Sequence, residues 1–274
     1  MLYDTHCHPY LAQKKSQNDI LENFFSWGWE YLNSISVDLD TSRSNIELSR
    51  QDKRILSVIG IHPTHILEYK DCIDDVMKEL ERLYRENPKS VVGIWETGLD
   101  YYWLEKLSEQ SWISQSNIRE IQKEFFKAHI QLAQKLWLPI VIHNRDSSED
   151  VFTILKEENC THFVFHCFSE DIHYAKKLLE FAPNCMLWFW GVLTFKNAET
   201  TRTVASEIPL TNIMIETDSP YLTPMPFRWK EENEPLFTRY VLDHISDIRS
   251  EDFGTIENQI FENSLKFFGI KKEV

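Results

Sequence analysis

The chain has 274 residues, of which 42% are hydrophobic, so it is long enough to bury the core of one large α/β domain. Its 43 acidic and 29 basic residues give a net charge of −14, which repels a polyanion such as DNA at long range. This excess of acidic residues argues against binding of nucleic acid through a broad basic surface. Any nucleic-acid partner would have to be held locally, by metal ions or by a few basic side chains.

The cysteines and the apolar runs of the sequence bear on the expected cellular compartment. No charged and then apolar leader opens the sequence, and no apolar run reaches the roughly 18 residues that span a membrane. We therefore expect a soluble, cytoplasmic protein without membrane attachment, and no obligate protein partner is evident. The scattered cysteines lack the paired spacing of a structural zinc site, and we expect reduced thiols at Cys7, Cys72, Cys160, Cys167 and Cys185.

Short β-rich apolar runs alternate with longer segments of helical period along the chain. After the first predicted strand, "NDILENFFSWG" predicts a helix over 18–28, with Asn18 as its N-cap and Gly28 at its end. Further along, "IQKEFFKAHIQLAQKL" keeps the helical period over 121–136. In chain order, the eight predicted strands are 2–6, 30–37, 55–61, 90–96, 139–143, 163–166, 186–190 and 213–217.

The order of these elements predicts the fold class. No linker rich in Pro, Gly or Ser and no shift in composition divides the chain, although 225–235 has the composition of a long polar loop. Eight strands that alternate with helices predict an α/β fold, a single (β/α)8 TIM-type barrel over residues 1–274.

Polar residues follow the C-terminal ends of several predicted strands, where barrels of this type carry their active sites. Four imidazoles and two carboxylates occur there, a ligand set suited to Zn²⁺ or Mn²⁺. Six ligands exceed what one tetrahedral ion needs, so we expect a pair of divalent ions roughly 3.5 to 4 Å apart. The six candidate ligands are His6, His8, Glu96, His143, His166 and Asp218.

Three further residues are candidates for contacts with substrate phosphate or for support of the ligands. His62 either contacts phosphate or supports a ligand, or it caps its loop. Arg145 and Arg228 can pair with a phosphate through their planar guanidinium groups. Alternatively, Arg145 forms a structural ion pair and Arg228 is solvated. His65 is left open. Asp100 and Glu216 are expected to brace loops.

The ordered motifs of the chain resemble the TatD family of metal-dependent deoxyribonucleases, within the amidohydrolase-like barrel superfamily. The resemblance covers nearly the whole length, and the ordered set is far more specific than any one motif. It is carried by "YDTHCH", "IGIHP", "WETGLDYYW", "PIVIHNRD", "FHCFS", "GVLTFKNA", "IETDSPYLTP", "NEP" and "ENSLKFF".

The resemblance implies a function for the site. The six candidate ligands match the metal residues of the family, with Glu96 bridging two ions, His6 and His8 completing one, and His143 and His166 completing the other. Three bulky or charged residues, Trp95, Glu170 and Trp229, stand where the family commonly has glycine, and they affect the expected substrate range rather than the metal chemistry.

The predicted reaction is hydrolysis of a phosphodiester, with DNA as the substrate that the resemblance implies. Two ions of Mg²⁺, Mn²⁺ or Zn²⁺ per chain would supply a hydroxide at neutral pH, with Asp218 as both ligand and proton acceptor and Glu96 as bridging group. Two alternatives remain. One is a hydrolase of amides or lactones on the same barrel, and the other is a non-catalytic descendant that binds metal.

Overall fold

The computed structural model describes residues 1–271, and the chain packs as two compact units. The first unit combines residues 1–34 with the chain from Cys167 onward, and the second comprises Ile35–His166. Whether the chain behaves as the single domain expected from its sequence stays a prediction. The strands are β1 (Tyr3–Cys7), β2 (Tyr31–Ile35), β3 (Ile55–Ile59), β4 (Val91–Asp100), β5 (Ile140–Arg145), β6 (Phe163–Phe165), β7 (Met186–Phe189) and β8 (Ile213–Ile215).

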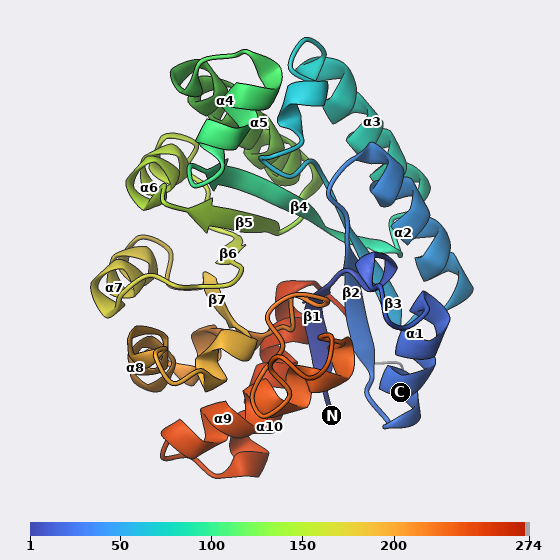
Figure 1. Ribbon diagram of the computed structural model, residues 1–274, viewed down its shortest axis with the longest axis vertical. Helices are drawn as coiled ribbons and strands as arrows, with labels where there is room; N and C mark the ends of the chain where they lie inside the picture. Colours follow the sequence, from blue (N-terminus) through green and yellow to red (C-terminus); the bar gives the residue numbers. More distant parts are fainter. Residues whose placement is uncertain (272–274) are drawn as a thin grey trace. The chain divides into compact units, whose positions relative to one another are not determined.

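Helices follow the strands as the sequence predicts, and Figure 1 shows them in chain order by colour. In addition, short 3₁₀ turns occur at Pro9–Leu11, Ile66–Glu68, Gly191–Thr194, Leu210–Asn212 and Pro235–Phe237. The helices are α1 (Gln17–Ser26), α2 (Leu39–Gln51), α3 (Ile73–Glu86), α4 (Leu104–Ser111), α5 (Gln115–Leu136), α6 (Ser148–Glu157), α7 (Ile172–Phe181), α8 (Glu199–Glu207), α9 (Thr238–Ile248) and α10 (Phe253–Phe267).

Four parallel strands form the core of the first unit. β1 pairs with β2, and β7 pairs with β8. At their C-terminal ends β1 and β8 are joined, because the Thr5 hydroxyl donates to the Ile215 carbonyl at 2.6 Å and a parallel bridge links Cys7 to Ser219. Residues that follow β1 and β8 therefore lie next to each other.

The second unit contains the parallel strands β3, β4, β5 and β6, paired in chain order. β4 is longer than the predicted 90–96, because its last residues pair with β5, where Asp100 lies opposite Arg145. Glu96 is therefore inside the strand, and its predicted place at the strand end is wrong. All ten residues of β4 are buried.

Serine hydroxyls cap the starts of α1 and α5, and one of these caps differs from the prediction. Ser16, not Asn18, is the N-cap of α1, and its hydroxyl accepts from the backbone N–H of Asp19 at 3.2 Å. α5 spans Gln115–Leu136 and contains the predicted helical stretch 121–136, and Ser114 caps its start in the same way. Gly28 has φ +79°, a left-handed conformation that suits glycine after a helix, as expected.

The structure bears on two expectations, the state of the cysteines and the presence of a membrane-spanning helix. All five cysteines are free thiols, as predicted. Among residues 1–271 no helix combines the length and the apolar character needed to span a bilayer.

Candidate metal centre

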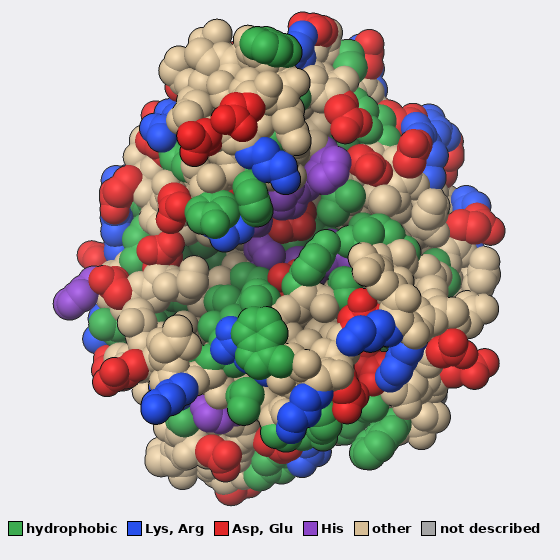
Figure 2. Space-filling model, viewed as in Figure 1, with side chains coloured by type: hydrophobic (Ala, Val, Ile, Leu, Met, Phe, Trp, Pro, Cys, Tyr) green, Lys and Arg blue, Asp and Glu red, His purple; other side chains and the backbone are tan. Residues whose placement is uncertain are grey.

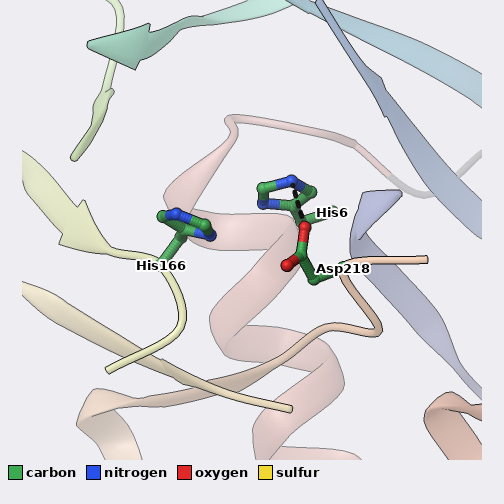
Figure 3. A group of neighbouring side chains, drawn as sticks. All are labelled: His6, His166 and Asp218. Atoms are coloured by element: carbon green, nitrogen blue, oxygen red, sulfur yellow. Dashed lines mark ion pairs between the residues drawn. The ribbon is translucent and has the colours of Figure 1, made fainter. Parts of the chain in front are cut away.

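The first unit brings together three of the predicted ligands. His6 lies in β1, His8 follows it, and Asp218 follows β8. The Nε2 atoms of the two imidazoles are 2.9 Å apart, and Oδ1 of Asp218 lies 3.2 Å from Nε2 of His6 and 3.7 Å from Nε2 of His8. Figure 3 shows the His6–Asp218 ion pair as a dashed line. Three donor atoms thus converge at the C-terminal edge of β1 and β8.

A second carboxylate in this unit, Glu216, contacts the other nitrogen of His6. Its Oε2 lies 3.1 Å from Nδ1 of His6, and both side chains are fully buried. The backbone N–H of Cys167 donates to its Oε1 at 2.5 Å. Burial, followed by the negative charge of Asp218, raises the pKa of Glu216 well above its usual range. Glu216 therefore lies at ion-pair distance from the far nitrogen of the His6 ring, whose Nε2 faces the other candidate ligands.

The second unit brings together the other three predicted ligands. Oε1 of Glu96 lies 3.0 Å from Nδ1 of His143 and 3.0 Å from Nε2 of His166, and these two nitrogens are 3.1 Å apart. His62 also belongs here, with Nε2 3.4 Å from Glu96. Its Nδ1 lies 2.6 Å from the hydroxyl of Thr64. The structure thus supports a place for His62 beside the ligands and leaves its exact role a prediction.

Asp100 contacts the far ring nitrogen of His143, as Glu216 contacts that of His6. Its Oδ2 lies 3.0 Å from Nε2 of His143, so the opposite nitrogen of the ring faces Glu96. Burial lowers the pKa of His143, but its hydrogen bonds to Asp100 and Glu96 outweigh burial and raise the pKa to about 9. Oδ1 of Asp100 also accepts from the backbone N–H of Trp103 at 3.0 Å.

The charge state of Glu96 follows from the imidazoles around it. Burial by itself raises the pKa of a carboxyl group. The charges of His62 and His166, together with the hydrogen bond from His143, outweigh that effect and hold the pKa of Glu96 well below its usual range. Glu96 is therefore a carboxylate at every pH near neutrality, as a metal ligand must be.

Both clusters fit a divalent ion. Ligand atoms about 2.0 to 2.2 Å from one tetrahedral ion lie roughly 3.3 Å from one another, close to the separations found within each cluster. In each cluster an oxygen of a buried carboxyl group lies 3.0 to 3.1 Å from the far nitrogen of a histidine, a position from which proteins commonly orient imidazole ligands. The metal and the number of ions stay predictions.

The two predicted phosphate-binding arginines are stacked on aromatic rings. The Arg145 guanidinium lies 3.7 Å from the ring centroid of Tyr102, and that of Arg228 lies 3.6 Å from Phe195 and 4.7 Å from Trp229. Within residues 1–271 neither guanidinium has a carboxylate at ion-pair distance, so the structure shows no ion pair for Arg145 in that range. Figure 2 shows acidic and basic side chains interspersed on the visible face.

The sequence did not reveal how Asp100 and Glu216 act. Both were expected to brace loops, and Asp100 does so through Trp103. Their contacts with imidazole nitrogens depend on strand pairing, since Asp100 reaches His143 from the neighbouring strand. The available signal was their position, four residues after Glu96 and two before Asp218.

Comparison with known proteins identifies the family. The family described as TatD related DNase matches residues 3–269. The chain belongs to the TatD family of metal-dependent hydrolases. It is 35% identical to the uncharacterized metal-dependent hydrolase YabD of Bacillus subtilis, over 98% of this chain and all of the relative. It is 32% identical to the uncharacterized metal-dependent hydrolase YcfH of Escherichia coli K12, over 98% and 96% of the two chains.

Solved structures establish the fold class of this TatD family member. The crystal structure of YJJV, a TatD homolog from Escherichia coli K12, aligns with a TM-score of 0.83 at 22% identity and covers 98% of each chain. The predicted (β/α)8 barrel is thereby confirmed. A phosphotriesterase homology protein from Escherichia coli, solved with phosphate in its active site, has the same fold, with a TM-score of 0.66 at 13% identity over 97% of each chain.

Proposed function

We propose that this TatD family member hydrolyses phosphodiester bonds, with DNA as its substrate, and uses two divalent ions per chain, Mg²⁺, Mn²⁺ or Zn²⁺. The observation that supports this most strongly is the presence of two clusters, each with imidazoles, an inner carboxylate and a buried outer carboxylate. One ion bound in each cluster would account for all six predicted ligands. The family description as a DNase supports the choice of substrate.

Asp218 is suited to accept a proton in this reaction. Its side chain is 15% exposed, whereas that of Glu96 is 6% exposed, so it is the more open of the two inner carboxylates. Oδ1 faces the two imidazoles of its cluster, and Oδ2 lies 3.5 Å from the Cys167 thiol. With one oxygen directed at the ligands, the other is placed to take a proton from an attacking water.

The histidines and outer carboxylates hold the ligand atoms in place. Glu216 and Asp100 fix the rings of His6 and His143, which reduces the reorganisation needed on binding. When bound, divalent ions would lower the pKa of water and offset charge on a phosphoryl oxygen. Arg145 and Arg228, which lack carboxylate partners among the described residues, are placed to bind phosphate oxygens.

A screen of metals against substrates tests the proposal. The purified protein is incubated with single-stranded DNA, duplex DNA, RNA, a small chromogenic diester, an amide and a lactone, each with Mg²⁺, Mn²⁺ or Zn²⁺. We expect DNA cleavage that requires metal and stops in chelator. Turnover of the amide or lactone without phosphodiester cleavage would replace the proposal. Fewer than two bound ions per chain, with no turnover, would indicate a non-catalytic descendant.

A further inference from the structure

Two large aromatic side chains are exposed beside the cluster of the second unit. Tyr102 and Trp103 follow Asp100, the last residue of β4, and are 53% and 37% exposed. Their ring centroids are 4.9 Å apart and their planes meet at 87°. Exposing rings of this size to water is unfavourable, so a contiguous pair of them beside a candidate active site suggests a binding role.

Arg145 completes this group. It is the last residue of β5, opposite Asp100 in the ladder, and its guanidinium lies 3.7 Å from the Tyr102 centroid and 5.7 Å from that of Trp103. In a chain of net charge −14, its guanidinium has no carboxylate within ion-pair distance among the described residues. Its positive charge is thus available to an anion.

The aromatic group is tied to the ligand cluster through one carboxylate. Asp100 accepts from the backbone N–H of Trp103 with one oxygen and contacts His143 with the other. The backbone N–H of Tyr101 also donates to the Arg145 carbonyl at 2.9 Å. The rings and the guanidinium are therefore held at the C-terminal ends of β4 and β5, where Asp100 contacts His143.

We propose that Tyr102, Trp103 and Arg145 form a subsite for an unpaired nucleobase, which stacks on the aromatic group while the guanidinium contacts an adjoining phosphate. This inference rests on the proposed function, because the substrate is taken to be a nucleic acid. Every base has a π face that stacks on aromatic rings, and arginine combines a stacking plane with a fork for phosphate oxygens. A base held here belongs to a nucleotide next to the phosphodiester that is cleaved.

The test compares two oligonucleotides that share a backbone. Fluorescence anisotropy with Mn²⁺ measures binding of a short phosphorothioate oligothymidylate, which resists hydrolysis, and of the same backbone with abasic units. We expect the parent to bind the base-bearing oligonucleotide at least about tenfold more tightly. Tyr102→Ala and Trp103→Ala should lose most of this preference. Tyr102→Phe, which keeps the ring, should retain it, and Arg145→Gln should weaken binding of both oligonucleotides.

Trp137→Ala is the matched control. Trp137 is 92% exposed in the same unit but precedes β5, at the opposite end of that strand from Arg145, so its loss should change neither affinity. Circular dichroism establishes that each variant is folded. Equal affinity of the parent for the two oligonucleotides, or an unchanged preference in folded Tyr102→Ala and Trp103→Ala, would overturn the subsite.

Cleavage of unmodified oligothymidylate by the parent separates this inference from the proposed function. If the parent cleaves DNA but binds the two probes equally, the subsite is wrong and the function stands. If the parent binds the bases through Tyr102 and Trp103 but cleaves no phosphodiester, the subsite stands as a binding site and the proposed reaction is wrong. If it does neither, both proposals fail.

Discussion

The two ligand clusters have the same plan but different surroundings. In the first unit Asp218 faces two imidazoles, and the outer carboxyl group, Glu216, is buried next to another carboxylate. In the second unit Glu96 faces three imidazoles, and the outer carboxylate, Asp100, contacts a histidine whose pKa is raised to about 9. The first cluster therefore has two carboxyl groups for two imidazoles, whereas the second has two carboxyl groups for three imidazoles.

This difference separates two roles for an inner carboxylate. Surrounded by imidazoles and buried, Glu96 remains charged and is held on several sides, which suits a permanent ligand. Asp218 is more exposed, has φ +53° and lies in the segment after β8, where its second oxygen is not fixed by imidazoles. This difference supports the proposed division of roles, with metal binding at Glu96 and proton transfer at Asp218.

The largest expected effect is that of removing a ligand from either cluster. Glu96→Gln and His6→Ala should each lower turnover about 10⁴-fold, since the ions are expected to supply several kcal/mol of transition-state stabilisation. Circular dichroism should show an intact fold, and metal analysis a loss of bound ion. Glu124→Gln, an exposed carboxylate on α5, is the control and should behave as the parent. Activity of Glu96→Gln within tenfold of the parent would contradict its role.

The second prediction tests whether Asp218 differs from Glu96 in function. Asp218→Asn keeps an oxygen for coordination but has no basic site, so we expect kcat to fall by 10² to 10⁴, about the contribution of a positioned general base. Excess metal should not restore it. The measurement is a metal titration followed by single-turnover kinetics on a short DNA substrate. Recovery to nearly the parental rate at high metal would show that Asp218 is a ligand alone.

The third prediction compares the outer carboxyl groups in metal-free protein. Asp100 has a lowered pKa, since hydrogen bonding to His143 outweighs burial, so Asp100→Asn removes a buried charge-assisted bond and should cost about 1 to 3 kcal/mol of unfolding free energy. Glu216 has a raised pKa, because burial and the charge of Asp218 disfavour its ionised form, so Glu216→Gln removes a charge whose burial is unfavourable while its amide can keep both contacts. Urea unfolding at neutral pH in chelator should show that Glu216→Gln lowers the unfolding free energy by less than about 1 kcal/mol.

The pH dependence of these two variants has opposite signs. Glu216 binds its proton more tightly in the folded than in the unfolded state, so its contribution to stability is present at low pH and is lost as pH rises from its unfolded pKa of about 4.5 through the raised folded pKa. Asp100 contributes above its unfolded pKa of about 3.8 and loses this contribution as pH falls. Relative to the parent, Glu216→Gln should gain stability with rising pH, and Asp100→Asn should lose it.

The sequence indicated which side chains gather in the two clusters better than it indicated which groups position them. Spacing along a strand is local, so the runs that became β1, β5 and β8 could be recognised with their histidines and aspartate. The contact of Asp100 with His143 depends on the pairing of β4 with β5, and the extent of β4 to Asp100 depends on the same ladder. Such contacts have no local signature. The predicted Asn18 cap of α1 was wrong for another reason, because Ser16 and Asn18 both fit a helix start.

The smallest expected effect concerns the two arginines, which extend the comparison beyond the clusters. Arg228 lies on Phe195 and Trp229 in the first unit and Arg145 on Tyr102 in the second, and neither has a carboxylate partner among the described residues. A phosphate contact made in both ground and transition states affects binding rather than chemistry. Arg228→Ala should therefore raise KM about tenfold, as expected for one charge-assisted bond, and change kcat less than about twofold.

Steady-state kinetics with short DNA at two salt concentrations measures both constants, and Arg239→Ala, whose guanidinium pairs with Asp243, is the matched control. The increase in KM should shrink at high salt, because screening weakens the contact in the parent. An unchanged KM for Arg228→Ala would contradict its proposed contact with phosphate.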